Sequence, residues 1–211
     1  DCLPNIPSAP ELPIVENFSA SPPVFKRLAG RFGAALWKQI KDNSSQWGVS
    51  PSGILLAAYA TIIALWSKNS QFTINISLFH RLPLHPQIND IIGDFTSLIL
   101  LPVTNSTESF ALRAQKIQKQ LWQNLDHRYF SGVEVLRELG RLQGRNEAIL
   151  PVVFTSDLTD TREQRHSPFS WLGKVNYSIT QTPQVWMDNQ VSEADGALIF
   201  NWDGVEERFL P

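Results

Sequence analysis

Sulfur and net charge are both scarce in this sequence of 211 residues. Its one cysteine, Cys2, excludes an internal disulfide and a thiolate zinc cage, and it favours a reducing cytoplasm as the compartment. Lys and Arg total 18 against 20 Asp and Glu, and the net charge of -2 attracts the chain neither to nucleic acid nor to an anionic membrane. We therefore expect no nucleic-acid partner and no membrane partner.

Long hydrophobic runs are also missing. The most apolar stretch, Ile54 to Trp66, has 13 residues, whereas a membrane-spanning helix needs about 20. The opening residues lack a basic region followed by an apolar run, so the sequence predicts no secretory signal. Because it is apolar on nearly every face, the stretch is typical of a helix at the centre of a protein core.

Common catalytic and cofactor-binding patterns are absent as well. The sequence contains no G-x-S-x-G, G-x-x-x-x-G-K-[ST], G-x-G-x-x-G or H-E-x-x-H pattern. Its four histidines do not have the spacing of a metal site, since Pro83 separates His80 from His85 and the other two lie far away. We expect neither a bound metal nor a directly bound cofactor.

Proline, by contrast, is concentrated at the start of the chain. Residues 1–23 contain six of the 14 prolines. Because proline has no backbone N–H and a fixed φ, this segment cannot form a regular helix or a central strand. The sequence predicts an extended linker over residues 1–23 and one folded lobe over residues 24–211.

The rest of the chain mixes helical and extended patterns. Ser50 is a candidate cap for a helix that begins at Pro51, and Ser131 with Glu134 has the pattern of a capping box. Helices are predicted near residues 31–46, 51–66 and 107–127 and from 131 onward. Strands are predicted at residues 72–79, 95–104, 150–158, 175–190 and 196–204, with a polar loop at 159–167 and a hairpin turn between the last two strands. This order favours an α/β fold of mixed α+β type, with helices packed on a mixed sheet.

Short polar side chains interrupt several of the apolar strands. Thr155 and Ser156 come at the end of "PVVFTS", and Asp188 follows Trp186 at a spacing that would put both on one face of a strand. A buried threonine is often only a good strand former, and an aspartate at a strand end is often a turn residue. An indole beside Asp188 would instead remove water from the carboxyl group and raise its pKa, which suits proton transfer near neutral pH.

The order of these motifs resembles a known family. "LPLHPQINDIIGDFTSLILL", "LPVVFTSDL", "ITQTPQVWMDNQ" and "NWDGVEERF" look like the successive motifs of nonribosomal peptide synthetase heterocyclization domains, a branch of the condensation domains. The resemblance implies one of two lobes, each like half of chloramphenicol acetyltransferase. The first-lobe patterns H-H-x-x-x-D-G and D-x-x-x-x-D are both absent, so the sequence is similar to the C-terminal lobe alone.

The resemblance also implies a reaction and its residues. Such domains join a carrier-bound acyl or peptidyl thioester to Cys, Ser or Thr and then cyclodehydrate the product to a thiazoline or oxazoline. Asp188 matches the family's catalytic aspartate, and Thr155 matches its partner threonine. Possible substrate-binding residues are Gln184, Gln181, Trp186, His80 and Ser156, and a structural role is expected for Asp94 and Thr96.

The implied partners are the N-terminal lobe of the same domain, the upstream and downstream carrier proteins and an adjacent adenylation domain. Phosphopantetheine arms of the carriers would hold the substrates. The sequence departs from the family where His80-Arg81 replaces Asn-Arg and where Asp188-Asn189-Gln190 replaces Asp-His-Gln. Two alternatives therefore stay open: an ordinary amide-forming condensation lobe, and a noncatalytic lobe that docks carriers or supports its neighbours.

Overall fold

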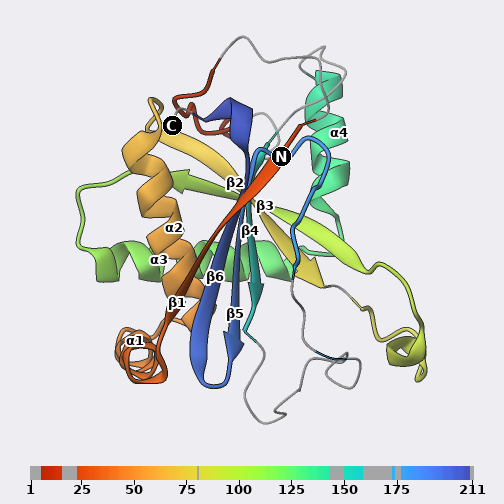
Figure 1. The fold of residues 1–211 in the computed structure, drawn as a ribbon. Coiled ribbons are helices and arrows are strands. Elements are labelled where there is room, and N and C mark those ends of the chain that lie inside the picture. The colour runs from red at the N-terminus through yellow and green to blue at the C-terminus, as the bar shows by residue number, and fades with distance from the viewer. Residues whose placement is uncertain are drawn as a thin grey trace.

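A computed structural model describes residues 6–15, 23–79, 81–142, 150–158, 173 and 177–209. Across these residues a six-stranded mixed sheet forms the centre, in the order β1-β6-β5-β4-β2-β3 (Figure 1). The strands are β1 (Phe25–Phe32), β2 (Gln71–Phe79), β3 (Thr96–Thr104), β4 (Val152–Asp157), β5 (Met187–Ala194) and β6 (Ala197–Val205). The helices are α1 (Ala34–Gln46), α2 (Pro51–Trp66), α3 (Phe110–Asp126) and α4 (Gly132–Leu142), with short 3-10 turns η2 (Ile88–Asp90) and η3 (Glu206–Arg208). The predicted mixed fold is confirmed.

Two strand pairs in the middle of the sheet are parallel. β4 runs parallel to both β2 and β5, whereas β2 pairs with β3, β5 with β6, and β6 with β1 in antiparallel fashion. A parallel pair needs a crossover, and the chain makes one through α3 and α4 between β3 and β4. The sheet therefore brings the ends of β4 and β5 together although they lie far apart in the sequence.

The helix caps follow the sequence closely. The Ser50 side chain accepts a hydrogen bond from the Gly53 N–H, and Pro51 occupies the first turn of α2. Ser131 and Glu134 cap α4 reciprocally: the Ser131 N–H donates to the Glu134 carboxylate at 2.8 Å, and the Glu134 N–H donates to the Ser131 hydroxyl at 3.3 Å. Both predicted caps are confirmed.

The first strand was not predicted from the sequence. Residues near 31–46 were expected to be helical, but α1 begins at Ala34 and Phe25–Phe32 forms the edge strand β1. The apolar residues Phe25, Leu28 and Phe32 have a helical rather than an alternating spacing, so the local pattern pointed the wrong way. Pairing with β6 decides the conformation, and Gly30 allows the Phe200 ring to pass where a Cβ would lie 2.2 Å from it.

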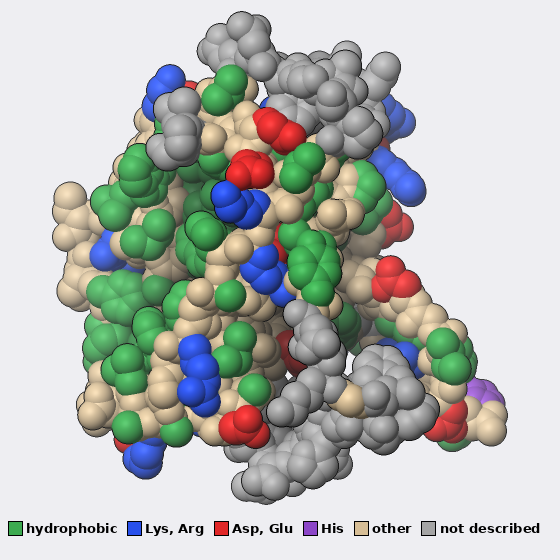
Figure 2. All heavy atoms as spheres, in the orientation of Figure 1, with side chains coloured by type: hydrophobic (Ala, Val, Ile, Leu, Met, Phe, Trp, Pro, Cys, Tyr) green, Lys and Arg blue, Asp and Glu red, His purple; other side chains and the backbone are tan. Residues whose placement is uncertain are grey.

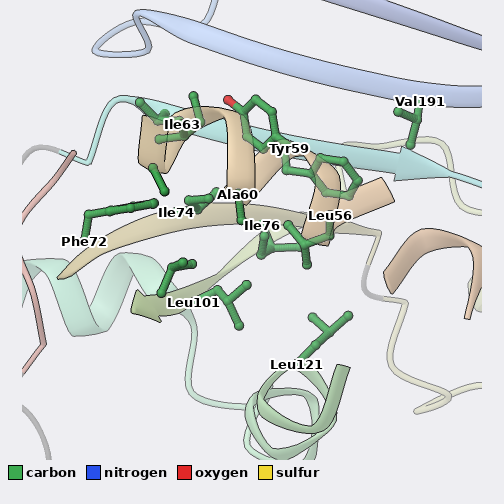
Figure 3. Close-up of a cluster of buried hydrophobic side chains, with 14 of the residues drawn as sticks. Leu56, Tyr59, Ala60, Ile63, Phe72, Ile74, Ile76, Leu101, Leu121 and Val191 are labelled. Carbon is green, nitrogen blue, oxygen red and sulfur yellow. The ribbon is translucent and has the colours of Figure 1, made fainter. Parts of the chain in front are cut away.

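The hydrophobic core lies between α2, α3 and one face of the sheet (Figures 1 and 3). Leu56, Tyr59 and Ile63 of α2 belong to one packed cluster with Ile74 and other alternate residues of the strands (Figure 3). α2 was expected to lie at the centre of the core, and this is confirmed, although its C-terminal end also exposes apolar side chains. Hydrophobic side chains gather on the surface over α1 and α2 (Figure 2), and the exposed ones on α2 are Ile62, Leu65 and Trp66.

Within the described ranges, no single helix is long and apolar enough to cross a membrane. α1 and α2 reach the required length and composition only when taken together, and their axes are bent by 97°.

The last two strands form the predicted hairpin, but the first of them begins later than expected. Asp195 and Gly196 make the turn with φ values of 52° and 71°, as a two-residue hairpin requires. The strand predicted over residues 175–190 is wrong for residues 177–186, where a turn contains Pro183 and Gln184, and residues 175–176 lie outside the described residues. Pro183 has no N–H for a ladder and Gln184 has a φ of 67°, so the chain cannot remain extended there.

The described part of the proline-rich segment lies against the end of the sheet. The Thr73 hydroxyl donates to the Pro7 carbonyl, the Leu12 side chain is buried, and Ile14 makes a bridge to Phe209. These contacts fix residues 6–15 as an extended cover over β2. The division into a linker at 1–23 and a lobe at 24–211 stays a prediction.

Candidate functional site

A pocket of about 940 Å³ opens on the face of the sheet opposite to α2. Side chains alternate along each strand, so Phe72, Ile74 and Ile76 enter the core while Asn75 and Ser77 face this pocket. β4 and β5 supply more polar residues, α4 supplies one wall, and the segment before β5 supplies another. The lining residues that carry polar side chains from the middle strands are Asn75, Ser77, Thr155, Asp157, Asp188, Gln190 and Ser192.

Asp188 and Thr155 meet on this pocket face. Thr155 of β4 is in register with Gln190 of β5, and Asp188 lies two residues before Gln190, on the same side of the sheet. The Thr155 hydroxyl donates to Oδ1 of Asp188 at 3.2 Å. Only 5% of Asp188 is exposed, so the two residues form one hydrogen-bonded unit in the pocket wall.

Gln190 holds the second oxygen of the Asp188 carboxylate. Its Nε2 donates to Oδ2 of Asp188 at 2.7 Å and also to the Thr180 hydroxyl, while its Oε1 accepts from Arg27 at 3.4 Å. Sequence reasoning noted Gln190 as part of a motif but gave it no role. The spacing of two residues from Asp188 was the available signal, since it places both side chains on one face.

An ion pair between Arg27 and Asp203 lies next to Gln190. Nε and Nη2 of Arg27 donate to the two carboxylate oxygens of Asp203 at 2.6 and 2.5 Å. Asp203 is fully buried and also accepts from the Thr180 N–H at 2.8 Å. A forked pair of this kind satisfies a buried carboxylate and fixes the guanidinium plane. Neither residue was among the predicted site residues, because the pairing of β1 with β6 was not predicted.

Burial and hydrogen bonding act on Asp188 in opposite directions. Burial raises the pKa of the Asp188 carboxyl group above its ordinary value of 3.8, while the hydrogen bonds from Gln190 and Thr155 lower it. The Asp203 charge raises the pKa as well, and the Arg27 charge lowers it. The net upward shift brings the carboxyl group closer to the pH at which it can both accept and release a proton.

Asn75 lines the pocket from β2 and carries a buried acceptor atom. Its Nδ2 donates to the Leu150 carbonyl. Asn75 is 5% exposed, and among the described residues its Oδ1 finds no hydrogen-bond partner. A buried polar atom without a partner is costly unless a ligand or water satisfies it. Its alternation with Ile74 and Ile76 along β2 could have identified Asn75 from the sequence.

The structure separates several other predicted residues from the pocket. The Trp186 ring lies against Arg208, 4.3 Å from its guanidinium carbon, and Trp186 does not line the pocket. It precedes β5, and its place outside the lining gives no support to the expectation that it contacts substrate. Gln181 is exposed outside the pocket lining, and the Ser156 hydroxyl is bonded at 2.8 Å to that of Ser52 on α2.

The remaining predicted residues fall into three places. Gln184 and Thr96 line the pocket. Asp94 lies just before β3, where its Oδ1 accepts a hydrogen bond from the Thr96 N–H at 2.8 Å, an arrangement typical of a turn. His80 lies outside the described residues, so its predicted contact with substrate stays a prediction.

Two further observations concern metal ligands and the other titratable group near Asp188. In the described part of the chain, no group of three or more His, Cys, Asp or Glu residues is placed to hold a metal ion. The buried Tyr59 hydroxyl is the titratable group of α2 that senses the Asp188 charge, and burial raises its pKa well above 10.0. Tyr59 therefore stays neutral.

Comparisons with known proteins connect this pocket to a family. The condensation-domain family model matches residues 7–191. The chain is 38% identical over 205 residues to pyochelin synthetase PchF of Pseudomonas aeruginosa and covers 11% of it, with 94% of the chain aligned. It is 37% identical over 214 residues to phenyloxazoline synthase MbtB of Mycolicibacterium paratuberculosis, with 99% of the chain aligned to 18% of that protein.

A solved structure agrees with these matches. The EpoB cyclization-docking bidomain of a nonribosomal peptide synthetase from Sorangium cellulosum superposes with a TM-score of 0.85 and 38% identity. The alignment covers 99% of this chain and 43% of the EpoB chain. The chain thus spans a small part of its curated relatives and less than half of this structural one. The resemblance to the heterocyclization branch is confirmed, and the chain belongs to the condensation-domain family.

Proposed function

We propose that this chain is the C-terminal lobe of a heterocyclization domain in a nonribosomal peptide synthetase. The domain would join an acyl or peptidyl thioester to a carrier-bound Cys, Ser or Thr and close a thiazoline or oxazoline ring. The observation that carries this proposal is the buried Asp188 carboxylate, hydrogen-bonded to Thr155 in the wall of a pocket of about 940 Å³. PchF, MbtB and EpoB support the choice of this branch.

The first step forms an amide. The amine of the acceptor residue attacks the thioester carbonyl, the C–N bond forms, and the upstream carrier leaves as its free thiol. This step needs the acceptor amine to be held against the thioester carbonyl carbon. Such positioning of two reactants supplies much of the rate of a reaction between them. The pocket of about 940 Å³ offers the space in which the reacting groups would be held.

The second step closes the ring and removes water. The thiol or hydroxyl of the acceptor residue attacks the new amide carbonyl and loses its proton, while the carbonyl oxygen becomes a hydroxyl. That hydroxyl then leaves as water with one added proton, the amide nitrogen loses its proton, and a C=N bond forms. Asp188 would accept a proton in the attack and return it to the leaving hydroxyl, which is general acid–base catalysis worth about 10²–10⁴-fold in rate.

Thr155 would keep the carboxylate in place through this cycle. A hydroxyl can donate to the ionised carboxylate and can accept from the protonated form, so the contact survives both states. The proposed partners are the N-terminal lobe of the same domain, two carrier proteins whose phosphopantetheine arms deliver the substrates, and an adenylation domain. The whole assembly would work in the cytoplasm.

The direct test uses the synthetase that contains this chain, with an acyl group on the upstream carrier. The downstream carrier is loaded in parallel with Cys, Ser and Thr, and the product masses are followed over time. We expect the mass of the amide less one water for at least one acceptor. An amide that accumulates without loss of water for all three would indicate an ordinary condensation domain, and no transfer at all would indicate a noncatalytic lobe.

A further inference from the structure

One row of charged residues crosses three neighbouring strands beside the pocket. Arg27 of β1 is in register with Asp203 of β6, and Asp203 is in register with Asp188 of β5. Two carboxylates directly opposite each other on antiparallel strands repel. Arg27 neutralises Asp203 through its two contacts of 2.6 and 2.5 Å. Asp188 is then the carboxylate of this row whose charge no ion pair within the row neutralises.

The ion pair also determines how the Gln190 amide is oriented. Arg27 carries only donors, so the Gln190 oxygen must face it, and the contact is 3.4 Å. The Gln190 NH2 group is then turned the other way, toward Oδ2 of Asp188 at 2.7 Å and toward the Thr180 hydroxyl. Rotation of this amide by half a turn would place oxygen against carboxylate and NH2 against guanidinium, and both contacts would be repulsive.

The influence of the ion pair on Asp188 is geometric more than electrostatic. The charges of Arg27 and Asp203 change the pKa of Asp188 in opposite directions, and both contribute less than burial and the two hydrogen bonds. The ion pair therefore acts on Asp188 mainly by fixing the position of Gln190. Asp203 also fixes the Thr180 backbone, whose N–H donates to it at 2.8 Å. Thr180 belongs to the segment that forms one wall of the pocket.

We infer that Gln190, oriented by the Arg27–Asp203 ion pair, is the positioning residue that presents Asp188 to the ring-closing step. This inference rests on the proposed function of Asp188. Thr155 fixes one carboxylate oxygen and Gln190 fixes the other, so the carboxyl plane is set by β4 and β5 together. Amide formation, which does not use the Asp188 proton, does not depend on Gln190.

Other charged or titratable groups face this part of the pocket and must be included in any pH measurement. Across the described residues, Arg27 and Asp203 lie in the same row, Asp157 and Arg137 lie on the pocket wall, and Tyr177 interacts with Arg27. Tyr59 on α2 senses the Asp188 charge from the other side of the sheet. Tyr59 stays neutral over the useful pH range, because burial raises its pKa well above 10.0.

The test replaces Gln190 with methionine, which has a similar length but neither a donor nor an amide oxygen, in the complete synthetase with loaded carriers. The ratio of cyclised product to open amide is measured at several pH values. Loss of one hydrogen bond to a charged group predicts a fall in the ring-closing rate of about 10-fold or more, with the rate of amide formation unchanged. The acidic limb of the pH profile should move to higher pH, because a bond that lowers the pKa of Asp188 is gone.

A second substitution tests the relay through the ion pair. In Arg27→Lys the ammonium group keeps a positive charge for Asp203 but cannot contact Asp203 and Gln190 as a fork does. We expect this variant to fold and to show a smaller loss of ring closure in the same direction. Gln123→Met is the matched control, since Gln123 is exposed on α3 away from the pocket, and it should behave as the unaltered protein.

The outcomes separate the inference from the proposed function. A Q190M variant with an unaltered product ratio and pH profile, or with both steps slowed equally, would overturn the inference. If Q190M does not fold, Gln190→Asn replaces it, because the shorter side chain withdraws the NH2 donor from Asp188. The same ratio of cyclised product to open amide then decides. If the unaltered protein makes only the open amide, the proposed function fails. Titration of aspartate carboxyl carbons, assigned by comparison with Asp188→Asn, still shows whether loss of Gln190 raises the Asp188 pKa.

Discussion

Asp188, the residue to which we assign the proton transfer, carries a buried carboxyl group that accepts two side-chain hydrogen bonds. The Thr155 hydroxyl and the Gln190 amide hold its two oxygens and lower its pKa, and burial outweighs them, so that the pKa is raised. The raised pKa brings this carboxyl group closer to the pH range in which it can both accept and release a proton.

The pH dependence of stability should reveal Asp188 directly. Its pKa in the folded protein is raised above the ordinary value of 3.8, so the folded state binds this proton more tightly than the unfolded state. That contribution is complete at low pH and is lost as pH rises through the pKa of the unfolded and then the folded group. We expect the unfolding free energy of the unaltered protein, relative to Asp188→Asn, to fall over this range. Urea titrations at a series of pH values measure it, and a constant difference would contradict the assignment.

At the scale of single residues, the sequence predicted the pair Asp188 and Thr155 but not the side chains that surround the pair. The pattern of each strand could place Thr155 and Asp188 on strand faces, but the register that brings them to 3.2 Å depends on β4 and β5 being parallel neighbours. Trp186 was expected next to Asp188 because a strand was assumed to include both. Arg27 and Asp203 were missed because their contact joins residues 176 positions apart.

At the scale of elements, α4 and β3 form the wall of the pocket through a close backbone contact. A Cβ on Gly132 would lie 2.9 Å from the Leu98 carbonyl oxygen, and backbone atoms cannot move aside as a flexible side chain can. This close approach explains why a glycine begins α4 directly after the capping residue Ser131.

We expect Gly132→Ala to push α4 away from β3 and to destabilise the fold by about 1–3 kcal/mol, as overpacking does. Gly33→Ala is a suitable control, because a Cβ there meets nothing within 4 Å and φ is -61°. Chemical denaturation of both variants measures the difference. Equal stability of the two would show that the α4–β3 contact is not as tight as described.

Elements with strong local signals were predicted well, and those that depend on distant partners were not. Ser50 and the Ser131–Glu134 pair marked their helix ends, since a cap is a contact within four residues. β1 was missed, because an edge strand with helical spacing of its apolar residues forms only when β6 lies beside it. The strand before Asp188 was placed too early, because the turn at Pro183 outweighed the alternating pattern.

For the molecule as a whole, the Arg27–Asp203 pair joins the first strand to the last. Asp203 is fully buried, so removing its partner leaves an unpaired charge inside the protein. We expect Arg27→Ala to lower the unfolding free energy by about 3–5 kcal/mol. Lys26→Ala, which removes an exposed ion pair with Glu206, should leave the unfolding midpoint almost unchanged. Similar losses from both variants would contradict the buried role of Asp203.

The central claim is that Asp188 moves the proton that ring closure requires, and one measurement tests it most directly. The synthetase carrying Asp188→Asn is supplied with loaded carriers, and the masses of open amide and cyclised product are followed together. The account predicts that the amide still forms while ring closure falls by about 10²–10⁴-fold. Ring formation at the unaltered rate in the Asp188→Asn protein would contradict it.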